Sequence, residues 1–329
     1  MQATEKGILK PEKWAGQSLG LLADELLLAG LVSRDAGSNF TGAAGDTVNI
    51  KRPTKLKARG QSIDENRKGT AITEDRLAEW KISIKLTDEV YSAVKLTSAE
   101  LTLDVENYGA QVISPQTSAV ADDIEQRLAK TFDAVASVEK IDEAKIGTEE
   151  AGREVRRVMI QLRKKLNDEG VPAAGRNLVI GTEVEAAILG DDHLTKVNES
   201  GTGETLRNAT IGNLYGFRIV VSQHVDPKRM VAYHPTAFML VTRAPAIPSG
   251  GPVGSTSSFG GVALTVQKDY NPTSRSERSI INTFTGINEV KDIPKAAYKT
   301  LTGNETFEAL EGKAKQIRAV AATIGAKAK

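Results

Sequence analysis

Hydrophobic residues recur at helical spacing in three long stretches of the chain. In residues 11–32, Pro11 suits a first helical position and leucines form a wide apolar stripe, which needs a partner surface. The residues that follow are rich in turn formers, so this helix is expected to dock far away in the sequence or on another chain. A second helix is predicted from Ser114, an N-cap before Pro115, over at least ~20 residues or about 30 Å. A third is predicted over 153–167.

Alternation of apolar and polar residues predicts β-strands elsewhere. Residues 80–86 alternate cleanly, and Val48 and Ile50 alternate before Pro53, so these segments are expected to form the two halves of a hairpin. The pattern "TSAE" at 97–100 is a capping box that opens a short helix. Further strands are predicted over residues 177–180, 213–225, 229–235, 236–242, 262–270 and 278–290, with a helix capped by Thr182 between the first two.

The order of these elements does not alternate strand and helix, which indicates an α+β fold with two interleaved regions. One region takes the long helix, the strand near Trp80 and a terminal hairpin at 262–290; the other takes about 150–255. The glycine- and serine-rich residues 245–261 are interpreted as a flexible connection. The tail from Asp292 is basic and alanine-rich, and is expected to be partly helical and loosely attached.

The segment between the two hairpin strands is long and strongly charged. Residues 51–69 carry seven basic and two acidic side chains, and their large apolar residues are Leu56 and Ile63. Too few apolar groups are present to bury this segment against its own domain. The whole stretch between the two strands, residues 53–79, reaches roughly 40 Å at ~3.3 Å per residue for half its length.

Composition excludes several classes of protein. The chain has 329 residues, a net charge of +1 and no cysteine, so a strongly basic nucleic-acid-binding domain, disulfides and thiolate metal sites are excluded. Its apolar runs fall short of the ~18 residues of a membrane span, and charged residues interrupt the N-terminus where a secretory signal would lie.

The search for chemistry yields no credible active site. His193, His224 and His234 lie in separate segments without the HxH or HxxxH spacing of a metal site, and solvated loop positions explain them better. The two glycine clusters lack the lysine and the strand–loop–helix context of a phosphate loop. Asp122 and Asp123 are expected on the solvated face of a helix. We therefore predict no catalytic residue, no metal and no cofactor, and interpret the chain as an assembly subunit with outward-facing features.

The order and spacing of the segments resemble the major capsid (coat) protein of tailed bacteriophages, whose fold encapsulin shells also use. The resemblance covers about residues 8–290 and is strongest to the branch with a separate scaffolding protein. The segments that carry it are "WAGQSLGLLADELLLAGLV", "GDTVNIKRP", "WKISIKLTDEVYS", "SPQTSAVADDIEQRLAKTF", "RNLVIGTEVEAAIL", "IGNLYGFRIVVSQHV" and "MVAYHPTAFMLV". The chain departs from the family in having no room for an inserted domain and in its tail.

The resemblance implies a division of the chain into the parts of a coat protein. These are an N-terminal arm (1–45), an extended β-hairpin loop (46–86), a peripheral domain with a spine helix (87–149), an axial domain (150–255), a terminal hairpin of the peripheral domain (256–291) and a C-terminal tail (292–329).

The resemblance also implies that the arm and the extended loop contact neighbouring copies, the loop through charge complementarity. The function implied is self-assembly into pentamers and hexamers of an icosahedral head around double-stranded DNA. The implied partners are a separate scaffolding protein, since the arm follows the first Met within a few residues, a portal and a decoration protein; the location is the virion, after assembly in the host cytoplasm. The residues predicted to make inter-subunit contacts are Trp14, Leu22, Leu26, Lys51, Lys55, Lys57, Arg59, Arg67 and Lys68.

Two other functions remain open from the sequence. One is an encapsulin-like compartment, which would use the same architecture to hold an enzyme cargo. The other is an α+β enzyme with an unrecognised site. Electron microscopy separates shells from small particles, and packaged DNA separates the first function from the compartment.

Overall fold

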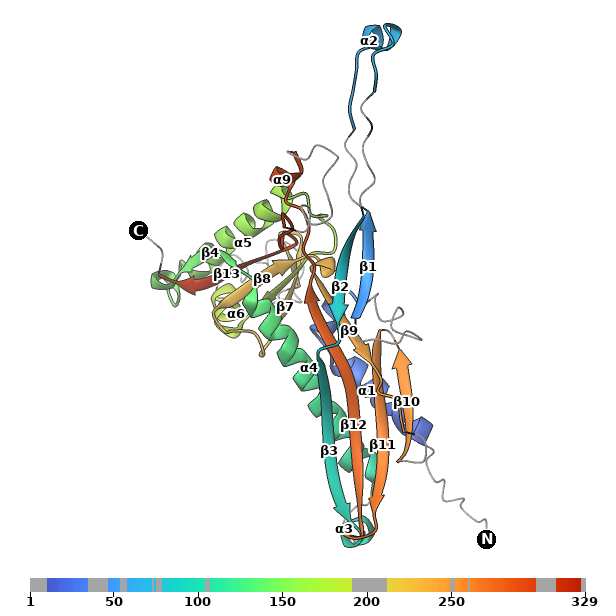
Figure 1. The fold of residues 1–329 in the computed structure, drawn as a ribbon. Helices are drawn as coiled ribbons and strands as arrows, with labels where there is room; N and C mark the ends of the chain where they lie inside the picture. The colour runs from blue at the N-terminus through green and yellow to red at the C-terminus, as the bar shows by residue number, and fades with distance from the viewer. Residues whose placement is uncertain are drawn as a thin grey trace, which may run out of the picture.

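The computed structural model describes residues 11–34, 47–53, 58–72, 74, 79–103, 107–190, 212–248, 252–259, 261–299 and 312–326. The chain is α+β, with two main sheets that share one long helix and with a projecting hairpin (Figure 1). The helices are α1 (Pro11–Glu25), α2 (Ile63–Arg67), α3 (Ser98–Leu103), α4 (Ser114–Ala134), α5 (Ala151–Asp168), α6 (Thr182–Leu189) and α9 (Lys295–Lys299), with shorter turns at Ala29–Leu31, Gly109–Ile113, Glu143–Lys145 and Pro235–Ala237.

The first sheet is long and antiparallel, in the order β10–β11–β12–β3, and β9 also pairs with the far end of β12. Helices α1 and α4 pack on this sheet (Figure 1). Its longest strand is β12, which pairs with β11. These two strands form the terminal hairpin that the sequence predicted, so that prediction is confirmed. The strands are β3 (Asp88–Thr97), β9 (Phe238–Arg243), β10 (Val253–Phe259), β11 (Val262–Asn271) and β12 (Ser276–Glu289).

The second sheet is mixed and has six strands in the order β4–β13–β8–β5–β7–β6. Helices α5 and α6 cover one face of it, and their apolar residues form a core with that face. The other face joins the core of α1, α4 and the first sheet. The strands are β4 (Ser137–Asp142), β5 (Asn177–Ile180), β6 (Asn213–Leu214), β7 (Phe217–Val221), β8 (Arg229–Tyr233) and β13 (Ala319–Gly325).

Three aromatic rings join the two sheets to the long helix. Phe132 of α4 lies 5.0 Å from Tyr233 of β8 and 4.8 Å from Phe238 of β9, centroid to centroid. All three side chains are fully buried. The helix predicted from Ser114 is confirmed at 21 residues. Ser114, however, is not its N-cap, because a π-helical turn over Gly109–Ile113 leads directly into α4.

The hairpin of β1 (Thr47–Pro53) and β2 (Glu79–Lys85) is antiparallel, with Thr47 opposite Lys85 and Pro53 opposite Glu79. Figure 1 shows it leaving the body of the molecule, with α2 at its far end. This confirms the hairpin that alternation predicted.

The structure corrects three sequence interpretations of the second half of the chain, two of strands and one of a helix cap. Residues 245–261 contain β10, an edge strand, where a flexible connection was expected. Residues 213–225 form the β6–β7 hairpin, turned by Tyr215 and Gly216 with φ of 49° and 78°, where one strand was expected. In α6 the N-cap is Gly181, and Thr182 makes no capping hydrogen bond.

The tail is the largest correction. Residues 319–325 form β13, which pairs with β4 on one side and with β8 on the other, so the tail is not loosely attached. Ala321 and Ala322 are fully buried. Strand pairing thus places β13 in the six-stranded sheet, and places β9 and the beginning of β10, both from within 150–255, in the first sheet.

Candidate assembly surfaces

The tip of the hairpin is held together by its own short-range bonds. Ser62 N–H donates to Glu65 Oε2 (2.8 Å) and Glu65 N–H donates to Ser62 Oγ (3.2 Å), a capping box that begins α2. Every residue from 58 to 72 is exposed, including Ile63 at 74% and Ile72 at 72%. The tip therefore buries none of its side chains against the described part of its own chain, and two isoleucines remain available to another surface.

The base of the hairpin is fixed to β12. Thr87 N–H donates to Thr285 O (3.0 Å), and Asn288 Nδ2 donates to Ser83 O (2.8 Å). A Cβ on Gly286 would lie 2.3 Å from Lys85 O, so this close crossing requires glycine. Ile84 is fully buried beside β9. The hairpin thus has an anchored base and an exposed tip.

Among the predicted contact residues of the loop, three lie on the exposed tip. Arg59 and Lys68 are exposed, and Arg67 forms an exposed ion pair with Asp64 at 3.6 Å. Lys51 lies in β1 opposite Lys81. Lys55 and Lys57 lie outside the described residues, and Trp14 lies in α1 with a side chain outside them.

Leu22 and Leu26 are not available to a neighbouring copy. Their exposed fractions are 0% and 6%, and they belong to the core formed with α4 and the first sheet. Helix α1 packs on α4, β10 and β11. The apolar stripe therefore docks far away in the sequence on the same chain, which was one of the two expectations, and the predicted inter-subunit role of these two leucines is wrong.

A carboxylate that the sequence interpretation missed fixes the end of α1. Leu28 N–H and Ala29 N–H donate to the two oxygens of Glu125 at 2.8 and 3.0 Å. These bonds divert the backbone from the α-helical pattern, so α1 ends at Glu25 and a short 3₁₀ turn over Ala29–Leu31 follows, where a helix to residue 32 was expected. Glu125 was missed because it is a charged residue in a run of charged residues, with Asp122 and Asp123 just before it, which indicated the exposed face of the helix.

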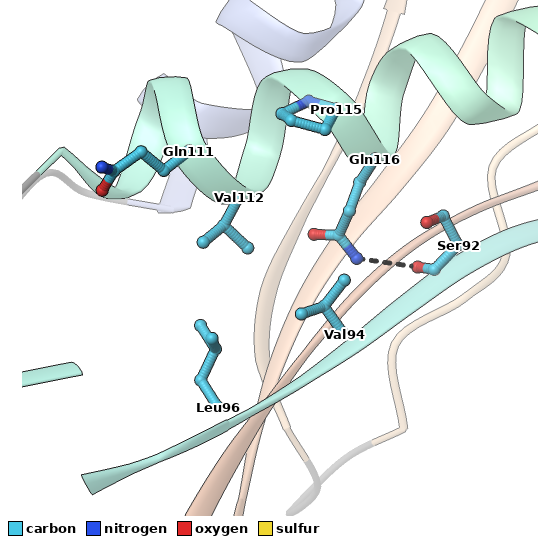
Figure 2. Close-up of a pocket in the computed structure, with 7 residues that line it drawn as sticks. All are labelled: Ser92, Val94, Leu96, Gln111, Val112, Pro115 and Gln116. Carbon is cyan, nitrogen blue, oxygen red and sulfur yellow. Dashed lines mark hydrogen bonds between the residues drawn. The ribbon is translucent and has the colours of Figure 1, made fainter. Parts of the chain in front are cut away.

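A groove lies beside the outermost strand of the first sheet. Figure 2 shows it between β3 and the start of α4, with Val94 and Leu96 facing Val112 and Pro115. Its volume is about 410 Å³. Buried Gln116 closes its inner end, donating from Nε2 to Ser92 O and Ser279 O at 3.0 Å each (Figure 2 draws the first). An edge strand beside an apolar groove is a surface that commonly accepts another chain.

Histidines and carboxylates within the described ranges do not gather as a metal site would require. His224 lies 3.4 Å from Asp122 on the surface. Burial, together with the charges of Arg318 and Arg176, lowers the pKa of His234, and its Nδ1 lies 2.9 Å from Thr236 Oγ1. His193 lies outside the described residues. Within those ranges, none of the helices combines the length and apolarity that crossing a membrane requires.

Comparison with known proteins rests on structure alone. No protein-family model matches the sequence, and no curated protein sequence matches it. A chain in a structure of Mycobacterium phage Che8 matches with 18% identity and a TM-score of 0.60, covering 90% of each chain. A chain of the capsid of Cyanophage P-SCSP1u matches with 9% identity, a TM-score of 0.58 and coverage of 87% of this chain and 85% of the other.

A chain of the mature capsid of bacteriophage PhiM1 matches with 13% identity, a TM-score of 0.54 and coverage of 86% and 83%. These matches cover 83–90% of each chain. They show that the chain has the fold of phage capsid chains, as the resemblance predicted.

Proposed function

We propose that the protein is the major capsid protein of a tailed bacteriophage and assembles into the pentamers and hexamers of an icosahedral head around double-stranded DNA. The observation that carries this proposal is the match of fold over 90% of both chains to a phage structure. The exposed hairpin tip supports it, because a projection whose described tip residues are all exposed suits a subunit that completes itself on its neighbours.

The domain names follow from the two sheets. We assign the peripheral domain to the first sheet with α4, and the axial domain to the six-stranded sheet with α5 and α6. The ranges 87–149 and 150–255 remain the main blocks of these domains. The terminal hairpin at 256–291 completes the peripheral domain, the loop at 46–86 projects from it, and the tail at 292–329 completes the axial sheet.

The hairpin tip and the groove beside β3 are proposed as the two sides of one seam between copies. The tip offers Ile63 and Ile72 together with basic side chains. The groove offers apolar walls and the outer edge of β3. Burial of the isoleucines supplies affinity, and the charges set orientation and the rate of association. Many seams of this kind make the loss of one subunit costly without a covalent bond.

The partners proposed for this function are further copies of the chain, a separate scaffolding protein, a portal and a decoration protein. Packaged DNA would be contacted without sequence specificity, and no role in a membrane is proposed. The protein would be assembled in the host cytoplasm and remain in the virion.

Electron microscopy of the purified full chain tests the proposal. Co-expression with the scaffolding protein of the same phage should give closed shells, and the chain alone should give capsomers or irregular particles. Small particles of one or two subunits under both conditions would contradict the assembly function. Uniform shells of native size from the chain alone would contradict the need for separate scaffolding.

An encapsulin-like compartment is the alternative with the same architecture. It is distinguished by the content of shells purified from the natural source. Nuclease-resistant double-stranded DNA supports the phage head, whereas a single co-purified enzyme without DNA supports the compartment. A catalytic role is not proposed.

A further inference from the structure

A cavity lies where the 3₁₀ turn after α1 meets the edge of the six-stranded sheet, and none of the described residues that line it is acidic. Its volume is about 610 Å³, and among the residues that the structure describes its charged lining groups are Arg176 and Arg218. Asn177 and Asn213 also line it. We call it the Arg176–Arg218 cavity. Among these described lining residues, two cations and two amides give the cavity a positive potential.

The guanidinium of Arg176 is buried and held in place on one side. Arg176 is 2% exposed. Its Nε donates to Pro172 O (2.7 Å), and its Nη2 donates to Val171 O (2.6 Å) and Asn167 Oδ1 (2.8 Å). These bonds use three of its five N–H donors. The Nη1 group makes no hydrogen bond to the described residues, and none of their carboxylates forms an ion pair with Arg176.

Strand register places three polar side chains in a row on one face of the six-stranded sheet. Arg176 comes directly before Asn177 and its guanidinium bonds to the end of α5 on the other side, and both Arg176 and Arg218 line the cavity. Arg218 of β7 lies opposite Asn177 of β5 and opposite Asn213 of β6. Residues directly opposite one another on neighbouring strands project from the same face of a sheet. Asn177 Nδ2 donates to Leu31 O (3.2 Å), so this is the face that meets the turn after α1. Arg218 is exposed, and its side chain therefore remains free to close on a ligand.

A third guanidinium adds to the positive potential. Arg163 of α5 donates from Nη1 to Tyr215 O (2.6 Å), and it lies against Gly216, another lining residue of the cavity. Burial, and then the charge of Arg163, lower the pKa of Arg176. Buried cations in proteins are normally paired with an anion, because an unpaired buried charge is strongly unfavourable. A bound anion would compensate the charge of this cluster.

We propose that the Arg176–Arg218 cavity binds a small oxyanion of the phosphate class. A fixed guanidinium edge, a second mobile guanidinium and two amide groups match the several acceptor oxygens of such an anion. The cavity is a recess of limited volume at a sheet edge, which suits a small anion rather than an extended chain. This inference does not depend on the proposed shell function, since it concerns a property of the single subunit.

Thermal unfolding and calorimetric titration of the purified full chain test the proposal, with inorganic phosphate as the probe and chloride at equal ionic strength as the reference. Phosphate also stabilises proteins generally by exclusion from their surfaces. The decisive comparison is therefore between Arg218→Gln and Lys164→Gln, which each remove one exposed cation. Lys164 lies on α5 and does not line the cavity.

We expect phosphate to raise the Tm of the wild type and of Lys164→Gln by several degrees more than chloride does. In Arg218→Gln the binding constant should fall at least tenfold and the specific rise in Tm should disappear. Equal responses of all three proteins, or no response beyond that to chloride, would overturn the proposal. A response that depends on Arg218 with a short DNA duplex but not with phosphate would also overturn it, in favour of a DNA contact.

Arg176→Lys provides a second variant. It keeps the positive charge but loses the planar guanidinium that can donate two hydrogen bonds to one anion, so it should weaken phosphate binding.

Discussion

Glu125 is the residue on which the junction between α1 and the long helix depends. It is 4% exposed, and its two oxygens accept the N–H groups of Leu28 and Ala29. Burial raises the pKa of this carboxyl, and the two N–H bonds and the charge of His224 only partly offset that effect. A raised pKa means that the folded chain holds this proton more tightly than the unfolded chain does. Ionisation of the buried carboxyl therefore lowers the stability of the fold.

The contribution of Glu125 to the stability of the fold depends on pH. Between the ordinary glutamate pKa of 4.5 and the higher folded-state pKa, the folded chain binds more protons, so the contribution of Glu125 to stability falls as the pH rises. Glu125→Gln cannot ionise and lacks this contribution. We therefore expect the free-energy difference between wild type and Glu125→Gln, measured by urea unfolding, to favour the wild type more at pH 5 than at pH 7. A difference that stays constant or grows with pH would contradict the assignment.

Leu22 tests whether the arm helix belongs to the core of its own subunit. The resemblance placed Leu22 at a contact with a neighbouring copy. Because Leu22 is fully buried within its own chain, we expect Leu22→Asp to misfold, and Leu22→Ala to lower the free energy of unfolding by ~2–5 kcal/mol. Leu27→Ala is the matched control: this side chain is 48% exposed, and its loss should cost less than ~0.5 kcal/mol. Urea unfolding of the free subunit measures both, and equal small losses would place α1 outside the core.

At the scale of elements, two strands were not predicted from the sequence. They form because they pair with neighbouring strands, and not because their apolar and polar residues alternate. β13 has the sequence "AVAATIG", whose alanines favour helix by intrinsic propensity, yet it pairs on both sides within a sheet. β10 has the sequence "VGSTSSF", in which glycine and serine indicate a loop, yet it pairs with β11 along its whole length. Helices α4 and α5 and the β11–β12 hairpin were predictable because their apolar residues keep one period over many residues.

Removal of β13 tests its structural role. A chain that ends at residue 311 leaves β4 without its paired neighbour, exposes one edge of β8 and loses the burial of Ala321, Ala322 and Ile324. We expect a loss of several kcal/mol, comparable with the ~5–15 kcal/mol of a whole domain, and therefore no cooperative unfolding of the six-stranded sheet.

A chain that ends at residue 326 keeps β13 and serves as the control; it should unfold like the full chain. Circular dichroism during thermal unfolding distinguishes the two truncations. Wild-type cooperativity in the shorter chain would restore the interpretation of a loosely attached tail.

At the scale of the whole molecule, the sequence allowed the exposed part of the candidate surface to be predicted, but not the buried part. The loop could be predicted because a charged segment with few apolar residues has nothing to bury. The burial of Leu22 and Leu26 within their own chain could not be predicted, because an apolar stripe is the same whether its partner is another copy or a distant strand of the same chain. The cavity between Arg176 and Arg218 depends on strand register across β5, β6 and β7, which local patterns do not contain.

Assembly should depend on salt if the charges of the loop act across a seam. Reversal of two of its cations, Lys57→Glu and Arg59→Glu, places like charges against the acidic partners expected on a neighbouring copy. At low ionic strength this repulsion should reduce shell yield at least tenfold. At ~1 M salt the Debye length shortens to ~3 Å, and yield should recover toward the wild-type value because the apolar contacts of the tip are unchanged.

The control is the same reversal on the body of the molecule, Lys130→Glu with Lys164→Glu, which changes net charge equally at two exposed positions outside the loop. Sedimentation and electron microscopy measure the yield of shells, and trypsin gives an independent measure. Cleavage after Arg59, Arg67 or Lys68 should be fast in free subunits and slow in shells, because flexible loop tips are preferred cleavage sites until they are covered. Equal cleavage in both states, or normal assembly of the loop double reversal at low salt, would mean that the loop charges face solvent rather than a neighbouring subunit.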